Sequence, residues 1–174
     1  SGVKTKYIND AALPLVQVLM ETTDTNIVQA VYTYGNGLIS MNRADVNSYY
    51  HYDGLGSTRQ LTGNSGTVVA SYTYDSYGNV IASSGSITNA YGFTGEQQFN
   101  EADSLVYLRA RYYDPRIGRF ISRDPMLSLD YYAVRGVHLQ KLKEWHTRVK
   151  PRWLNAYVYC LNNPVNLVDP TGGC

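Results

Sequence analysis

The sequence predicts a mainly β protein built from repetitive antiparallel β-hairpins, with one short helical insertion near residues 131–149. The first observation is compositional: the 174 residues include 17 tyrosines but only three phenylalanines and two tryptophans, and 17% are charged. Tyrosine favours strands and combines an apolar ring with a polar tip, so it suits sheets whose faces are partly wet. The second observation is that a tyrosine-rich motif recurs along the chain. The third is that aspartate and glycine follow each copy, where a hairpin turn is needed.

The recurring motif is Tyr-x-Tyr, then Asp or Gly, a glycine-containing turn and a second extended run. It occurs as YTYGNG at 32–37, YHYDGLGSTRQ at 50–60 and YTYDSYGNVI at 72–81. Both tyrosines of a pair lie on one face, because alternate side chains of a strand point the same way. Aspartate closes an Asx turn and glycine accepts a positive φ, so each copy predicts a hairpin. A spacing of roughly twenty residues is typical of repeats whose neighbouring units complete each other's core.

Further hairpins are predicted between and after these copies. ALPLVQVLMETT and NIVQAVYTY form a pair around a polar turn at 22–26, and GNSG at 63–66 is a turn between two further runs. SLVYLRARYYD, at 104–114, alternates throughout and is interpreted as a single strand with Arg109 and Arg111 on one face. Two arginines on a strand face require carboxylate or carbonyl partners there.

Residues 131–149 change from strand to helical periodicity. Asp130 can cap the start of this helix, and Pro151 closes its end. Its basic side chains are interpreted as a solvated face rather than a nucleic-acid or membrane contact. The residues that carry this helical spacing, three or four positions apart, are Val134, His138, Leu142, Trp145 and Val149.

Charge and motif content argue against several classes of function. The net charge of +1 provides no global attraction to nucleic acid or an anionic membrane. No apolar run is long enough to span a bilayer and no signal peptide is evident, so any export is expected to depend on something outside this sequence. His51, His138 and His146 have no metal-ligand spacing with the cysteines, and no phosphate loop or serine elbow occurs. We therefore predict neither a metal nor a cofactor.

The most unusual stretch is RARYYDPRIGRFISRDP, at 109–125, which holds five arginines and two Asp-Pro pairs. Aspartate before proline favours a turn, so Asp114-Pro115 and Gly118 are predicted to form a structural corner. On local grounds alone, Asp124 and Asp169 would be interpreted in the same way. The remaining arginines are expected to tie strands to turn carbonyls and carboxylates: Arg109, Arg116, Arg119 and Arg123.

Four segments in order carry a family resemblance: YHYDGLGSTRQLT, YTYDSYGNVI, YGFTGEQQFNEADSLVYLRARYYDPRIGRFISRDP and NAYVYCLNNPVNLVDPTG. They resemble the tyrosine-aspartate (YD) repeats and the C-terminal core domain of Rhs proteins. The resemblance implies a YD-repeat hairpin region at 1–90 and an Rhs repeat-associated core at 91–174. In Rhs proteins, and in the similar C subunits of insecticidal toxin complexes, such a sheet winds into a cocoon-like shell around a toxic C-terminal polypeptide.

The resemblance also implies autoproteolysis of the aspartyl type, just after the DPxG segment of the core. The motifs assign the catalytic pair to Asp124 and Asp169, assisted by Arg111. Such hydrolysis uses one carboxyl to activate water and one to protonate the amide. Because the cut is intramolecular, positioning of the peptide contributes much of its rate. The implied cleavage-site motif comprises Pro164, Asp169, Pro170 and Gly172.

The implied partners are the rest of the Rhs shell, an enclosed C-terminal toxin and a secretion-system spike or adaptor. Delivery would then be by secretion or by a specialised bacterial secretion machine. The chain departs from the family pattern in two places: Gly173 replaces the usual leucine after DPxG, and the segment between RDP and NAYVYCLNNP is long. The first departure fits a cleaved remnant, a truncated piece or a degenerate copy.

Two alternatives from other classes of function stay open. One is a non-catalytic β-repeat module that binds carbohydrate or a partner through its tyrosine-rich strands. The other is self-association through exposed strand edges.

Overall fold

The structure is a computed structural model that describes residues 4–13, 15–99, 104–125 and 155–173. The prediction of a mainly β protein is confirmed, whereas the helix predicted near 131–149 lies outside the described residues. The chain forms two compact units, Ser1–Thr73 with Ile81–Asn89 and Tyr74–Val80 with Ala90–Cys174. The division into a repeat region and a core as functional domains stays a prediction. Within the described ranges, no helix is long and apolar enough to cross a membrane.

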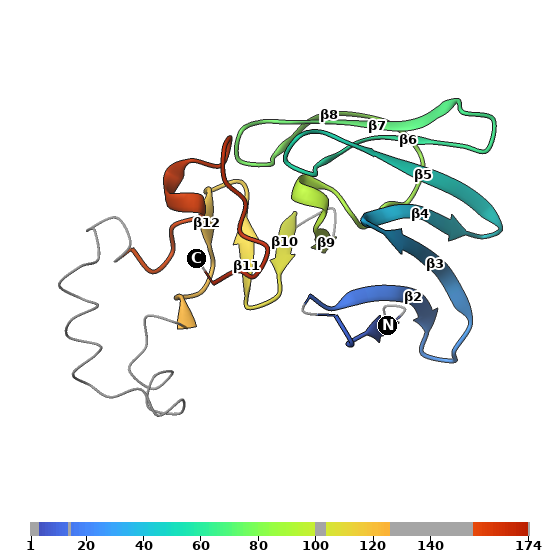
Figure 1. Cartoon of the computed structure of the whole chain (residues 1–174), viewed down its shortest axis with the longest axis horizontal. Helices are drawn as coiled ribbons and strands as arrows, with labels where there is room; N and C mark the ends of the chain where they lie inside the picture. Colours follow the sequence, from blue (N-terminus) through green and yellow to red (C-terminus); the bar gives the residue numbers. More distant parts are fainter. Residues whose placement is uncertain (1–3, 14, 100–103, 126–154, 174) are drawn as a thin grey trace. The chain divides into compact units, whose positions relative to one another are not determined.

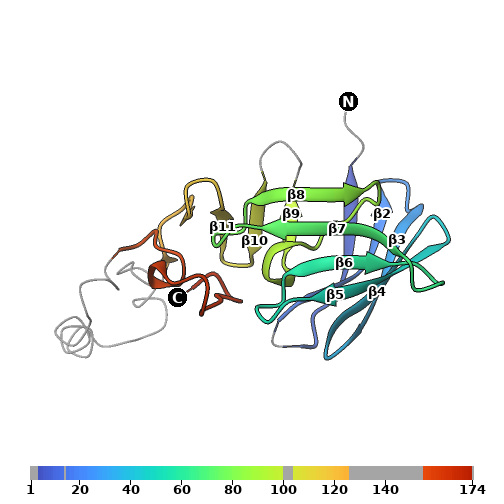
Figure 2. The same ribbon diagram turned by 90° about the horizontal axis from the view of Figure 1, so that it is seen from above.

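The first unit contains an eight-stranded antiparallel sheet in which the strands lie in sequence order. Figures 1 and 2 show the successive hairpins following one another around a curved sheet. Each strand therefore pairs with its neighbours along the chain, as the repeated motif predicts. The strands are β1 (Thr5–Asp10), β2 (Gln17–Thr23), β3 (Val28–Gly35), β4 (Gly37–Arg43), β5 (Val46–Tyr52), β6 (Thr58–Thr62), β7 (Val68–Tyr74) and β8 (Val80–Gly85).

The Asx turns predicted after Tyr-x-Tyr are confirmed. Asp53 Oδ1 accepts hydrogen bonds from the backbone N–H of Leu55 at 3.0 Å and of Ser57 at 2.9 Å. Asp75 Oδ1 accepts the equivalent bond from Asn79 at 3.0 Å. Gly56, in the first of these turns, has a φ of 86°, which an L side chain rarely adopts.

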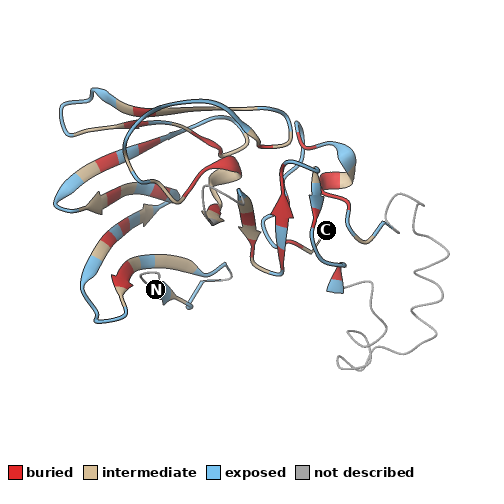
Figure 3. Cartoon of the chain, turned by 180° about the vertical axis from the view of Figure 1, so that it is seen from behind, coloured by how far each residue is buried: buried red, intermediate tan, exposed pale blue. Residues whose placement is uncertain are grey.

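One face of the sheet is more buried than the other, which gives the alternation of colours along the strands in Figure 3. Tyr32 lies opposite Met41, and Tyr50 lies opposite Leu61; all four side chains are buried. The two tyrosines of one motif share a face as predicted, because the rings of Tyr50 and Tyr52 stack with centroids 6.0 Å apart.

A charged network lies on this buried face. In the register of β2, β3 and β4, Glu21 and Arg43 flank Ala30 on either side. The small alanine leaves room for Arg43 Nη2 to reach Glu21 Oε2 at 2.6 Å. Tyr32 donates its hydroxyl proton to Glu21 Oε1 at 2.7 Å. Burial and the nearby carboxylate raise the pKa of Tyr32 well above its ordinary value.

The second unit contains a four-stranded antiparallel sheet in the order β12-β11-β10-β9. The connections from β10 to β11 and from β11 to β12 are short turns, and among the described residues a 3₁₀ turn precedes β9 and another follows β12 in the sequence. The elements are η1 (Phe93–Gly95), β9 (Gln97–Phe99), β10 (Leu105–Leu108), β11 (Arg111–Asp114), β12 (Arg119–Phe120) and η4 (Cys160–Asn162).

The interpretation of 104–114 as a single strand is wrong. The segment is a hairpin in which β10 and β11 pair antiparallel, with Leu108 opposite Arg111 and a two-residue turn at Arg109 and Ala110. Opposite residues of a hairpin share a face, so Arg111 lies with the buried Leu108 instead of continuing the face of Tyr107. The turn escaped prediction because it holds no Gly, Pro, Asn or Asp, although Arg109 has a φ of 59°.

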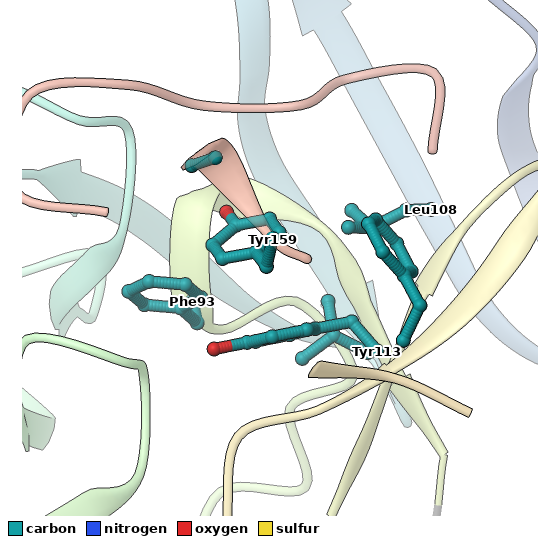
Figure 4. Packing of buried hydrophobic residues seen from close by; sticks show 7 residues of the cluster. Phe93, Leu108, Tyr113 and Tyr159 are labelled. Atoms are coloured by element: carbon teal, nitrogen blue, oxygen red, sulfur yellow. The ribbon is translucent and has the colours of Figure 1, made fainter. Parts of the chain in front are cut away.

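Aromatic rings fill the core of this unit, as the labelled side chains in Figure 4 show. Tyr113 and Tyr159 stack with ring centroids 4.1 Å apart, and the ring of Phe120 meets Tyr159 edge-on at 5.9 Å. The edge-on contact of Phe120 with Tyr159 is one of the geometries that the aromatic quadrupoles favour over face-to-face packing. The cluster comprises Phe93, Val106, Leu108, Tyr113, Phe120, Tyr159 and Cys160.

The structural corner predicted after β11 is confirmed. Gly118 donates its N–H to the Pro115 carbonyl at 3.3 Å and has a φ of 64°. Asp114 accepts hydrogen bonds from Arg116, through Nε at 2.9 Å and Nη2 at 2.8 Å. The side-chain bonds from Arg116 hold the pKa of the Asp114 carboxyl below its usual value. This first Asp-Pro pair therefore serves the fold.

Candidate functional site

The three residues predicted to be catalytic lie together in the second unit. Arg111 is the first residue of β11, and its side chain is only 1% exposed because the β10–β11 turn directs it to the buried face. Its Nη2 lies 3.2 Å from Asp124 Oδ2 and 3.8 Å from Asp169 Oδ2. Both carboxylates are buried as well. One guanidinium thus joins two aspartates that are far apart in the sequence.

The remaining contacts of Arg111 fix the plane of its guanidinium. Nη1 donates to the carbonyl of Ala156 at 2.9 Å, and Nε donates to the carbonyl of Gly172 at 2.5 Å. The Cζ atom lies 3.5 Å from the centroid of the Phe120 ring, which is a cation–π arrangement. Burying a charged group requires this degree of pairing, because an uncompensated charge is costly to remove from water.

Asp124 is placed by pairing between two distant backbone segments. Phe120 donates its N–H to the carbonyl of Tyr157 at 3.0 Å, and Asp124 donates its own to the carbonyl of Ala156 at 2.9 Å. These bonds align the chain around 120–124 with the segment around 156–158. Since Arg111 also binds the Ala156 carbonyl, one backbone oxygen positions both members of the ion pair.

Asp169 organises the turn that follows it. Its Oδ1 accepts hydrogen bonds from the N–H of Gly172 at 2.9 Å and of Gly173 at 3.3 Å. Gly172 has a φ of 66°, and a Cβ added there would lie 2.1 Å from the carbonyl oxygen of Leu108. Only glycine therefore fits at position 172 without a shift of the backbone.

These contacts hold both polar groups of one peptide bond, the one between Gly172 and Gly173. Its carbonyl oxygen faces Arg111 Nε, and its N–H faces Asp169 Oδ1. A positive donor fixed against a carbonyl oxygen can stabilise the negative charge that develops there during attack on the carbon. The site thus combines the positively charged guanidinium of Arg111 at the carbonyl oxygen with the carboxylate of Asp169 at the amide nitrogen. The second carboxylate, Asp124, lies beside the guanidinium.

Glu96 is a fourth charged member that sequence reasoning missed. Its Oε1 accepts a hydrogen bond from Arg109 Nη1 at 2.9 Å. Burial raises the pKa of the Glu96 carboxyl; the charge on Arg109 opposes this shift and the charge on Asp169 adds to it. Nothing in the local sequence separates Glu96 from an ordinary surface carboxylate, because its importance comes only from the hairpin that lies against it.

The expectation that arginines tie strands to carbonyls and carboxylates is confirmed for Arg109 and Arg116. Arg109 donates to the Pro170 carbonyl as well as to Glu96, and Arg116 binds Asp114. Pro164 is buried in a preceding turn, in which Leu167 donates its N–H to the Asn163 carbonyl at 3.1 Å. The roles of Pro164, Pro170 and Gly172 in a cleavage motif stay predictions.

Comparison with known proteins gives one family match. The family model described as Teneurin YD-shell matches residues 11–165. A tRNA3(Ser)-specific nuclease WapA of Bacillus spizizenii is 35% identical over 177 residues, which cover 99% of this chain and 7% of the relative. Double-stranded DNA deaminase toxin A of Burkholderia cenocepacia is 33% identical over 129 residues, covering 71% of this chain and 7% of the relative.

Solved structures show the same fold. The crystal structure of TcdB2-TccC3 aligns with a TM-score of 0.65 at 18% identity, over 97% of this chain and 8% of that one. A TcdB2-TccC3 structure without the hypervariable C-terminal region aligns with a TM-score of 0.61 at 20% identity, over 88% of this chain and 7% of that one. The chain thus spans less than a tenth of the length of each of these four proteins.

Proposed function

The chain belongs to the YD-shell family, and from this premise we propose that it closes a toxin-enclosing shell and cuts the polypeptide after its own Asp-Pro-Thr-Gly segment. The family model covers 11–165, and the relatives include a nuclease and a deaminase toxin. The single observation that supports cutting is the double hold on the Gly172–Gly173 peptide by Arg111 and Asp169. The enclosed toxin, the remaining shell and a secretion-system spike or adaptor are the proposed partners, with delivery by secretion.

In the proposed reaction, water adds to the carbonyl carbon of Gly172. Asp124 removes a proton from the attacking water, while the Arg111 guanidinium stabilises the oxyanion that forms on the Gly172 oxygen. The C–N bond then breaks as the proton that Asp124 took from the water is passed to the nitrogen of Gly173 through Asp169, whose Oδ1 lies 3.3 Å from that nitrogen. The products are a carboxylate at Gly172 and an amine at Gly173. The cut is needed only once per molecule, so fixed geometry provides much of the acceleration.

The test uses the full-length polypeptide that contains this chain, with a folded reporter protein fused after Cys174. Wild-type protein should yield two fragments whose masses place the cut between Gly172 and Gly173. Asp124→Asn keeps the shape of the side chain but removes the base, so cutting should slow by at least about a hundredfold.

Asp114→Asn is the matched control, because Asp114 also precedes a proline but binds Arg116 instead of Arg111. It should cut at the wild-type rate. Intact wild-type polypeptide would remove the protease proposal and leave the shell role. Cutting that survives Asp124→Asn would remove the assignment of Asp124 as the base.

The burial of two of the motif tyrosines argues against the alternative of a carbohydrate-binding surface. Stacking on sugars requires exposed rings, but Tyr32 is 4% exposed and Tyr50 is 7% exposed. Their hydroxyls bind Glu21 and Asn89 within the same unit. Tyr32 and Tyr50 therefore have the surroundings of core residues, whereas Tyr52 is 39% exposed.

A further inference from the structure

The hairpin turn at Arg109–Arg111 makes three consecutive contacts with the segment that ends at Gly172. The Arg109 side chain donates to the Pro170 carbonyl, and the Ala110 N–H donates to the Thr171 carbonyl at 3.2 Å. Arg111 Nε donates to the Gly172 carbonyl at 2.5 Å. Successive residues of the turn thus bind successive carbonyls of the segment. We refer to Arg109, Ala110 and Arg111 as the register clamp.

From this arrangement we infer that Arg109 is a positioning residue, which sets which peptide bond reaches Arg111 and Asp124. This inference rests on the proposed function. The clamp binds backbone oxygens, so it fixes the register of the segment without reading side chains. A shift by one residue in either direction would move the Gly172 carbonyl away from Arg111 Nε, and a shift that brought Thr171 to this position would also place a side chain against the Leu108 carbonyl.

The backbone of Arg109 supports a role other than folding. Its φ of 59° lies in the left-handed region, where a Cβ carries a steric penalty that glycine avoids. A two-residue turn would form more readily with glycine or asparagine at this position. Arginine has this backbone penalty, but its side chain contacts the Pro170 carbonyl and Glu96, which glycine or asparagine could not do in the same way.

Glu96 completes the clamp by orienting Arg109. Its Oε1 lies 2.9 Å from the same Nη1 that donates to the Pro170 carbonyl. Glu96 is placed by the chain just after η1, where its carbonyl accepts the N–H of Gly92 at 3.1 Å. The clamp therefore connects three separate segments of the second unit through one guanidinium.

The decisive variant is Arg109→Gly, because it relieves the backbone penalty while removing the side chain. If Arg109 served only the fold, this variant would change the unfolding temperature but cut at the wild-type rate and at the wild-type peptide bond. We expect normal thermal stability, cutting slowed by about a hundredfold and fragments cut at neighbouring peptides.

Arg109→Lys retains a cation that can reach the Pro170 carbonyl and should restore part of the rate. Arg116→Gln, which removes an arginine bound to Asp114, should cut as wild type.

A second measurement does not depend on cutting. In the uncut Asp124→Asn polypeptide, Arg109→Gly should speed hydrogen exchange at the N–H groups of Ala110, Gly172 and Gly173 by at least about tenfold. Unchanged exchange together with a single wild-type cut would overturn the clamp. Faster exchange in a polypeptide whose wild type is never cut would retain the clamp as a docking device and remove the proposed reaction.

Discussion

The two units use a buried arginine in different ways. In the eight-stranded sheet, Arg43 binds Glu21 across one intervening strand, and its side chain is 23% exposed. In the second unit, Arg111 is 1% exposed and binds Asp124, Asp169 and the Gly172 carbonyl. The first network joins consecutive hairpins and stabilises a local repeat. The second joins segments from the whole length of its unit, so a single substitution there should affect both folding and chemistry.

The largest expected difference is between Arg111→Gln and Arg43→Gln. Removal of Arg111 leaves two buried carboxylates without their counter-ion, which should lower the free energy of opening of the second unit by about 3–5 kcal/mol. Removal of Arg43 should cost about 1–3 kcal/mol, because Glu21 keeps its bond from Tyr32 and Arg43 itself is more exposed than Arg111. Hydrogen exchange at the Tyr113 and Met41 amides measures the two openings separately.

Equal losses at the two positions would contradict this comparison. They would mean that the contacts of Arg111 contribute no more than the single ion pair between Arg43 and Glu21. Arg111→Lys sharpens the test, since it keeps the charge but loses the planar fork that binds several partners together. Its cost should lie between that of Arg111→Gln and that of the wild type.

The second comparison sets Gly172 against Gly66. Both have positive φ angles, 66° and 78°, but a Cβ at Gly66 meets nothing within 4 Å, whereas one at Gly172 would lie 2.1 Å from the Leu108 carbonyl. Gly66→Ala should therefore cost about 1–2 kcal/mol from its backbone alone. Gly172→Ala should displace the segment from the register clamp and lower the rate of cutting by at least about a hundredfold. Normal cutting by Gly172→Ala would mean that the peptide reacts from another position.

The difference between the two units also explains which features could be predicted from the sequence. The hairpins of the first unit follow from Tyr-x-Tyr and from Asp and Gly in the turns, because each strand pairs with its neighbour in the chain. The turn at Arg109 has no such residues, so the alternation predicts a single strand with Arg111 on the face of Tyr107, whereas the hairpin places Arg111 with Leu108. Asp124 and Asp169 could be singled out only by resemblance, since locally both are ordinary Asp-Pro turns. Glu96 had no local signal of any kind.

The smallest expected effects concern the turns that close the repeats. Asp53→Ala removes the Asx bonds to Leu55 and Ser57 in an exposed turn, and should cost about 1 kcal/mol. Asp75→Ala should cost somewhat more, because Asp75 Oδ2 also accepts from Asn79 Nδ2, which in turn donates to the Pro115 carbonyl at 3.0 Å. The second turn is thus tied to the corner after β11, whereas the bonds of Asp53 stay within its own turn.

The pH dependence of the stability lost in Asp75→Ala shows whether the charge of the carboxylate causes the loss. Burial alone would raise the pKa of Asp75, but the bonds from Asn79 and the turn N–H groups outweigh it, so the pKa lies below its ordinary value. Stability from a carboxyl with a lowered pKa is present above the unfolded value of about 4 and is lost as the pH falls through the folded value. The difference between wild type and Asp75→Ala should therefore be constant near neutral pH and should shrink in acid. A difference that persists when the carboxyl is fully protonated would assign the effect to packing of the turn instead of to its charge.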